Sequence, residues 1–104
     1  MDHSEIQILV VDDQPSNLRL LSELLTRRGY QVYRAISGQL ALNAAMAHSP
    51  DLILLDIRMP EMDGYEVCQR LKATPETEQI PVIFLSVLDD IDDKIQAFQV
   101  GCAD

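Results

Sequence analysis

Three apolar runs divide this chain, and each of them ends in a polar side chain. The runs are residues 6–11, followed by Asp12 and Asp13, residues 51–56, which end in Asp56, and residues 80–86, which end in Ser86. Continuous apolar runs of about four to eight residues are typical of strands that are buried on both faces. We therefore expect a sheet that is covered on both sides.

The interval after the first run has the periodicity of a helix. Four leucines in residues 15–28 are spaced to share one inward face: Leu18, Leu21, Leu24 and Leu25. Pro15 suits the first turn of this helix, and Gly29 suits its end. As an alternative to any chemical role, the adjacent Asp12 and Asp13 could together cap this helix.

Strands and helices alternate along the rest of the chain. The expected elements are a strand at 31–35, a helix at 38–48 after a capping Ser37, the strand ending in Asp56, a helix at 65–73, the strand 80–86 and a last helix spaced by Ile91, Ile95 and Phe98. Such alternation predicts a parallel sheet with helices on both faces. The sequence therefore indicates an α/β, doubly wound fold.

Length and charge narrow the class of protein. The 104 residues suggest one domain, residues 1–104, and 17 acidic against 8 basic residues give a formal net charge of −9. A negative surface argues against direct binding of nucleic acid or an anionic membrane. No run approaches the roughly 20 apolar residues of a membrane span, and the N-terminal MDHSEIQ is no signal peptide. A cytoplasmic location is therefore expected.

The polar strand ends point to a cation. Ligands of open parallel sheets bind beyond the carboxyl ends of the strands, so Asp12, Asp13 and Asp56 are expected to meet there. Three clustered carboxylates repel one another unless a cation lies among them. Oxygen ligands without His or Cys suit Mg²⁺, which commonly bridges a few carboxylates and phosphate oxygens.

Together these residues resemble the receiver domain of two-component response regulators. The chain has an acidic pair after the first strand, LLDIRMPEMDG around Asp56, a hydroxyl at Ser86 and the closing GCAD. The resemblance implies a flavodoxin-like receiver fold with strand order 2-1-3-4 and four of the family's five strand–helix units. It also implies a phosphoacceptor signalling domain, a switch and not a turnover enzyme.

The same resemblance implies a role for each site residue. Asp56 would accept a phosphoryl group from a histidine kinase or a phosphotransfer domain. Mg²⁺, or Mn²⁺, would be held by Asp12, Asp13, Asp56 and the backbone carbonyl of Arg58. Ser86 would bond a phosphoryl oxygen and move on activation.

One feature of the family is not found. Its lysine at the end of a fifth strand has no counterpart, because the only lysines are Lys72 and Lys94 in helical patterns. The sequence is therefore interpreted as a receiver domain that is incomplete at its C-terminus. Without a fifth strand, the strand 80–86 would keep an unpaired apolar edge, and we expect the fragment to self-associate.

Two alternative functions remain open. Aspartate-nucleophile phosphatases also carry carboxylates after a first strand, but they need Asp-x-Asp, and Gln14 stands two residues after Asp12. A receiver-like interaction module that no longer takes phosphate would fit the absent lysine. The presence of Asp12, Asp13, Asp56 and Ser86 favours the phosphorylatable switch.

Overall fold

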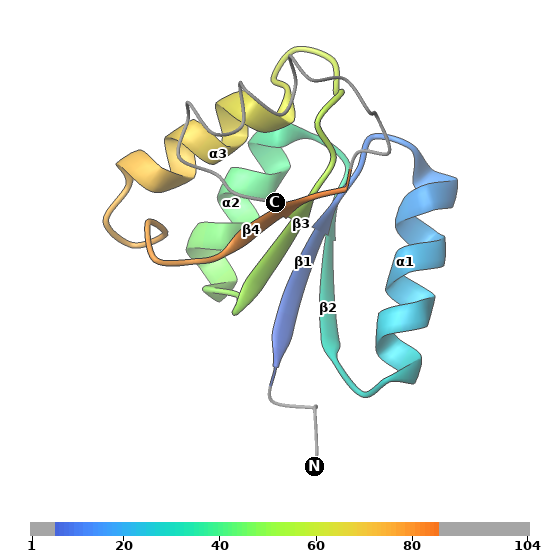
Figure 1. Ribbon diagram of the computed structural model, residues 1–104. Coiled ribbons are helices and arrows are strands. Elements are labelled where there is room, and N and C mark those ends of the chain that lie inside the picture. Colours follow the sequence, from blue (N-terminus) through green and yellow to red (C-terminus); the bar gives the residue numbers. More distant parts are fainter. Residues whose placement is uncertain (1–5, 86–104) are drawn as a thin grey trace.

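A computed structural model describes residues 6–85 of the chain, and it shows a parallel sheet flanked by helices (Figure 1). In chain order the elements are β1 (Gln7–Val11), α1 (Pro15–Arg27), β2 (Gln31–Ala35), α2 (Gly38–His48), β3 (Leu52–Leu55), α3 (Gly64–Ala73) and β4 (Val82–Phe84). The strand order is β2-β1-β3-β4. The doubly wound α/β fold and the order 2-1-3-4 that we expected are thus confirmed.

The strand β1 lies between β2 and β3 and sets the register of the sheet. Val11, its last residue, is paired with Ala35 of β2 and with Leu55 of β3. Leu55 is in turn paired with Phe84 of β4. Because all pairings are parallel, the carboxyl ends of β1 and β3 lie level at one edge of the sheet.

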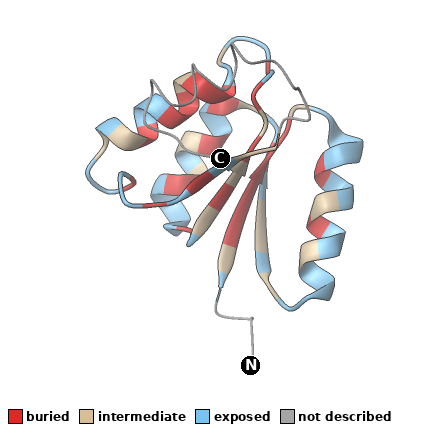
Figure 2. Cartoon of the chain, in the orientation of Figure 1, coloured by how far each residue is buried: buried red, intermediate tan, exposed pale blue. Residues whose placement is uncertain are grey.

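Helices cover both faces of the sheet, with α1 on one side and α2 and α3 on the other (Figure 1). Alternate residues of β1 serve the two sides. Ile8 and Val10 pack in a cluster with Leu18 of α1, whereas Leu9 and Val11 belong to the larger cluster that contains residues of α2 and α3. The buried residues accordingly run along β1 and β3 and along the inner sides of the helices (Figure 2).

Local chemistry explains where two of the helices begin. The Ser37 hydroxyl accepts a hydrogen bond from the N–H of Leu40 at 3.2 Å, as expected for the cap of α2. Asp63 caps α3 in the same way, accepting from the N–H of Glu66 at 2.9 Å. Helix α2 ends at His48, and its C-cap, Ser49, adopts a left-handed conformation with φ 46°.

The helix α1 departs from the sequence analysis in two respects. Leu24 is 44% exposed, so its placement on the inward face was wrong. Leu18, Leu21 and Leu25 do pack on the sheet, but the stripe that they cover is too narrow to include Leu24 as well. The cap of α1 is Gln14, which makes no side-chain hydrogen bond, so neither aspartate occupies that position.

The C-terminal elements expected from the sequence are either shorter in the structure or lie outside the described residues. The strand expected at 80–86 is shorter in the structure, where β4 spans Val82–Phe84. Ser86 and the helix predicted from Ile91, Ile95 and Phe98 lie outside the described residues. Among residues 6–85, no helix has both the length and the apolar character needed to cross a membrane.

Candidate functional site

The structure brings Asp12, Asp13 and Asp56 together at the carboxyl ends of β1 and β3. One carboxylate oxygen from each residue lies within 4.8 Å of the others. Asp12 is buried, whereas Asp13 and Asp56 are partly exposed, so the cluster opens to solvent on one side. This spacing suits a single cation bound by oxygen atoms of the three side chains.

Backbone pairing at the sheet edge holds two of the aspartates in place. The N–H of Asp12 donates to the carbonyl of Ala35 at 3.2 Å, and the N–H of Asp56 donates to the carbonyl of Val11 at 2.9 Å. The Asp12 carboxylate accepts from the N–H of Gln14 at 2.9 Å, which turns the chain from β1 into α1. Asp12 thus shapes this turn without being the helix cap.

The electrostatics of the cluster are unfavourable without a cation. Burial, followed by the charges of Asp12 and Asp13, raises the pKa of Asp56 to about 6. Hydrogen bonds from the backbone N–H groups of Arg58 and Ile57 act in the opposite direction and lower it. A cation among the three carboxylates would remove the repulsion and lower the pKa of Asp56 again.

The loop after β3 folds tightly against the site. The N–H of Gly64 donates to the carbonyl of Ile57 at 2.7 Å. A Cβ atom on Gly64 would lie 2.4 Å from the carbonyl oxygen of Asp56 and 2.9 Å from the Cα of Ile57, so only glycine fits at the start of α3. Glu61 completes this tight loop with a positive φ of 68°.

An open groove adjoins the cluster. Its volume is about 480 Å³, and it is lined by Asp13, Ile57, Arg58, Met59, Pro60, Asp63 and Tyr65. Arg58, whose backbone carbonyl was expected to bind the cation, lines the same groove as Asp13. Tyr65, which no sequence pattern singled out, is buried and meets Phe84 of β4 edge-on, with ring centroids 5.2 Å apart. The only hint in the sequence was that an aromatic residue directly follows Gly64, the first residue of α3.

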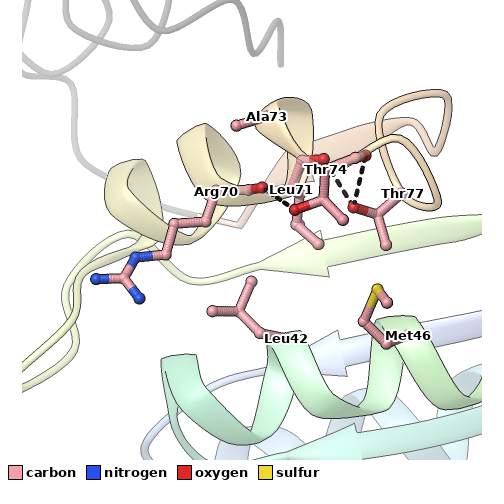
Figure 3. Close-up of a pocket in the computed structure, with 7 residues that line it drawn as sticks. All are labelled: Leu42, Met46, Arg70, Leu71, Ala73, Thr74 and Thr77. Atoms are coloured by element: carbon pink, nitrogen blue, oxygen red, sulfur yellow. Dashed lines mark hydrogen bonds between the residues drawn. The ribbon is translucent and has the colours of Figure 1, made fainter.

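A second depression, between α2 and α3, has a different character (Figure 3). Leu42 and Met46 line it from α2, and the hydroxyl groups of Thr74 and Thr77 lie at its other side. Both hydroxyls already donate to backbone carbonyls, Thr74 to Arg70 at 2.9 Å and Thr77 to Leu71 at 2.7 Å. These groups therefore stabilise the end of α3, and the depression offers little polar chemistry to a ligand.

Comparison with known proteins places the chain in a family. A model of the response regulator receiver domain matches residues 8–104. The chain is 47% identical over 98 residues to the response regulator PleD of Caulobacter vibrioides, an alignment that covers 94% of this chain and 22% of PleD. It is 43% identical over 98 residues to RpaA of Synechocystis, a DNA-binding dual master transcriptional regulator, covering 94% of this chain and 41% of RpaA. The chain thus spans less than half of either relative.

Solved structures agree with the sequence comparisons. The N-terminal domain of a response regulator receiver protein from Methanoculleus marisnigri superposes with a TM-score of 0.88 at 39% identity, covering 97% of this chain and 82% of that one. The chemotaxis protein CheY4 of Vibrio cholerae gives a TM-score of 0.89 at 28% identity, covering 94% and 82%. The chain therefore belongs to the family of response regulator receiver domains, the signalling domains of two-component systems.

Proposed function

We propose that Asp56 is the phosphoryl acceptor of this receiver domain and that a phosphohistidine of a histidine kinase or phosphotransfer domain is the donor. The observation that carries the proposal is the meeting of Asp12, Asp13 and Asp56 within 4.8 Å at the carboxyl ends of β1 and β3. Within the described residues this is the one group of three or more His, Cys or acidic side chains close enough to share a metal ion.

The donor set fits a divalent cation. Asp12, Asp13, Asp56 and the backbone carbonyl of Arg58 would hold Mg²⁺ or Mn²⁺, since all four supply oxygen atoms. When bound, the cation neutralises charge on the carboxylates and on the incoming phosphoryl oxygens. Burial and the charges of Asp12 and Asp13 raise the pKa of Asp56, and a cation at this position would offset both effects.

The chain's own residues would then position the reaction. A carboxylate oxygen of Asp56 attacks the phosphorus atom, the bond from phosphorus to the donor imidazole nitrogen breaks, and the imidazole leaves with the electron pair. Phosphoryl transfer of this kind needs alignment and charge neutralisation more than covalent help. Gly64 keeps the start of α3 close to the Asp56 backbone, and Ser86 would donate its hydroxyl to a phosphoryl oxygen.

The proposed output is a change in an attached domain or a partner protein. The relatives carry different names, a response regulator in one case and a DNA-binding transcriptional regulator in another. Since this chain covers less than half of each, those names do not assign an output to it. The proposed role is therefore that of a phosphorylation-dependent switch without a turnover activity of its own.

The test is incubation of the purified protein with acetyl phosphate and Mg²⁺, followed by intact mass spectrometry. We expect one added phosphoryl group, which is lost on treatment with hydroxylamine because acyl phosphates are labile. Asp56→Asn should take up none. Asp51→Asn is the matched control, because Asp51 is an exposed aspartate at the opposite end of β3, and it should be labelled like the wild type.

Two outcomes would reject the proposal. Label on a serine, threonine or histidine would show that a different group is the acceptor. No label on a folded protein that still binds Mg²⁺ would instead favour a receiver-like module that acts without phosphate.

A further inference from the structure

A second groove, away from the acidic cluster, gathers positive charge on a chain whose net charge is −9. It lies between α1 and the edge strand β2, has a volume of about 430 Å³, and contains Arg19, Arg27 and Arg34. These are three of the six arginines in the chain. We call it the arginine groove. It shares no lining residue with the groove beside Asp13.

Two elements build the arginine groove, so it is not simply one basic face of a helix. Arg34 pairs with Val10 and Val32 pairs with Ile8, which places both β2 side chains on the sheet face that α1 covers. Ser22 and Thr26 follow Arg19 on the flank of α1 that faces β2. Because β2 is at the edge of the sheet, Arg34 remains exposed beside the helix.

The charges in the arginine groove are only partly compensated. Arg19 forms an ion pair with Glu23 at 3.1 Å, but both side chains are more than half exposed, and such pairs contribute little. Arg27 and Arg34 have no acidic partner within residues 6–85. With three guanidinium groups and one carboxylate, Glu23, the lining of the arginine groove has a net charge of +2.

The kind of donor indicates the kind of ligand. The planar guanidinium group presents a fork of N–H donors that fits the oxygens of a phosphate group. Thr26 adds a hydroxyl, whereas the Ser22 hydroxyl already donates to the carbonyl of Leu18 at 2.6 Å. No aromatic side chain lines the arginine groove, so a nucleobase would find no surface on which to stack.

We propose that the arginine groove binds a small phosphate-bearing anion, which it recognises through the phosphate group itself. The volume lies within the range of about 300–1,000 Å³ that small-molecule sites occupy. Arg34 and Arg27 provide the main contacts, with Thr26 as an additional donor and Val32 as the apolar wall.

Inorganic pyrophosphate is the probe, titrated into the purified protein without divalent cation and at constant ionic strength. Under these conditions the three clustered aspartates repel the probe, so the acidic site does not compete. Backbone amide resonances followed by NMR should shift in a saturable manner at Ser22, Thr26, Val32 and Arg34. The amides of Asp12 and Asp56 should stay in place.

Variants and a second anion complete the test. Arg34→Gln should weaken pyrophosphate binding at least about tenfold, and Arg34→Lys should weaken it less, because lysine keeps the charge but not the fork. Arg70→Gln is the matched control, since Arg70 is an exposed arginine of α3 paired with Glu66. It should bind as the wild type does. Malonate, a dicarboxylate, should bind several-fold more weakly than pyrophosphate.

Three results would overturn the proposal. Shifts that never saturate would indicate solvated arginines without a site. An unchanged affinity in Arg34→Gln, with a native amide spectrum, would place binding elsewhere. Equal affinity for malonate and pyrophosphate would show attraction by charge alone.

Discussion

The backbone N–H of Asp56 donates a hydrogen bond to the carbonyl of Val11 over 2.9 Å, and this bond ties the carboxyl end of β3 to that of β1. Val11 directly precedes Asp12. The bond therefore places Asp56 beside Asp12, although their carboxylates repel each other. Backbone pairing in the sheet thus holds the carboxylates close together. A bound cation can relieve the repulsion between them.

Asp13→Asn is expected to abolish Mg²⁺ binding and to stabilise the metal-free protein slightly. The substitution removes one oxygen ligand and one of the two charges that raise the pKa of Asp56. Mg²⁺ titration followed by NMR or calorimetry measures the first effect, and urea unfolding measures the second. Glu76→Gln removes an exposed charge away from the site and serves as control. Unchanged affinity in Asp13→Asn would refute the assignment of this ligand.

In the metal-free protein, the contribution of Asp56 to stability is expected to fall as the pH rises from about 4 to about 6. The pKa of Asp56 is raised from 3.8 to about 6 in the folded state. Over this range the folded state keeps a proton that the unfolded state has released, so the free energy of unfolding decreases with pH. Solvent screens the partly exposed group, which limits the effect to about 1 kcal/mol.

Urea unfolding of the wild type and of Asp56→Asn, each measured across this pH range, isolates the contribution of Asp56. The variant should gain stability relative to the wild type as the pH rises, and saturating Mg²⁺ should reverse the order. If the stability of both proteins changed with pH in the same way, the pKa of Asp56 would not be raised in the folded state.

Gly64→Ala is expected to weaken both folding and Mg²⁺ affinity. The new methyl group would lie 2.4 Å from the Asp56 carbonyl oxygen, so the backbone must shift, at a cost of about 1–3 kcal/mol. Gly38→Ala is the matched control. Its methyl group would meet the side chains of Val67 at 2.8 Å and Met62 at 3.0 Å, so stability should fall while Mg²⁺ affinity stays the same. Equal losses of affinity in both variants would contradict a local effect of Gly64.

The 104-residue chain is expected to self-associate when prepared by itself. In the described part of the chain β4 pairs only with β3, and its outward Ile83 is 40% exposed. An apolar strand with an unpaired edge is a template for pairing with another chain. Light scattering after size exclusion should show a dimer or larger at concentrations on the order of tens of micromolar.

A version of the chain extended by a further strand and helix is the control for this experiment. It should shift toward the monomer, because the added strand would cover the edge of β4. A stable monomer of residues 1–104 would show that something else already covers that edge.

The buried strands and the carboxylate cluster were predictable from the sequence for a physical reason. A strand buried on both faces leaves a continuous apolar run, and a polar residue that ends such a run must lie at the edge of the sheet. Asp12 and Asp56 are of this kind. The strand order itself came from the resemblance to the family, since apolar runs do not specify which strands are neighbours.

Other features depend on contacts that no local pattern records. Thr77 lies in a polar stretch, yet it is buried because its hydroxyl donates to the carbonyl of Leu71 at the end of α3. The exposure of Leu24 depends on how α1 is rotated over the sheet. The arginine groove likewise needs the packing of α1 beside β2, because Arg19 lies on the helix and Arg34 on the strand.

The central position of β1 has a consequence for hydrogen–deuterium exchange. Its backbone is paired on both sides, and Leu9 and Val10 are fully buried beneath opposite layers of helices. Amides in such a strand exchange chiefly through opening of the whole domain, whereas loops exchange through local opening. Asp12 and Asp13 therefore follow a strand that is paired on both sides, and Asp56 does the same, because β3 pairs with β1 and with β4. Because Mg²⁺ binding would stabilise the folded state, it should slow the exchange of β1 amides, which need opening of the whole domain, as well as exchange in the loop after β3.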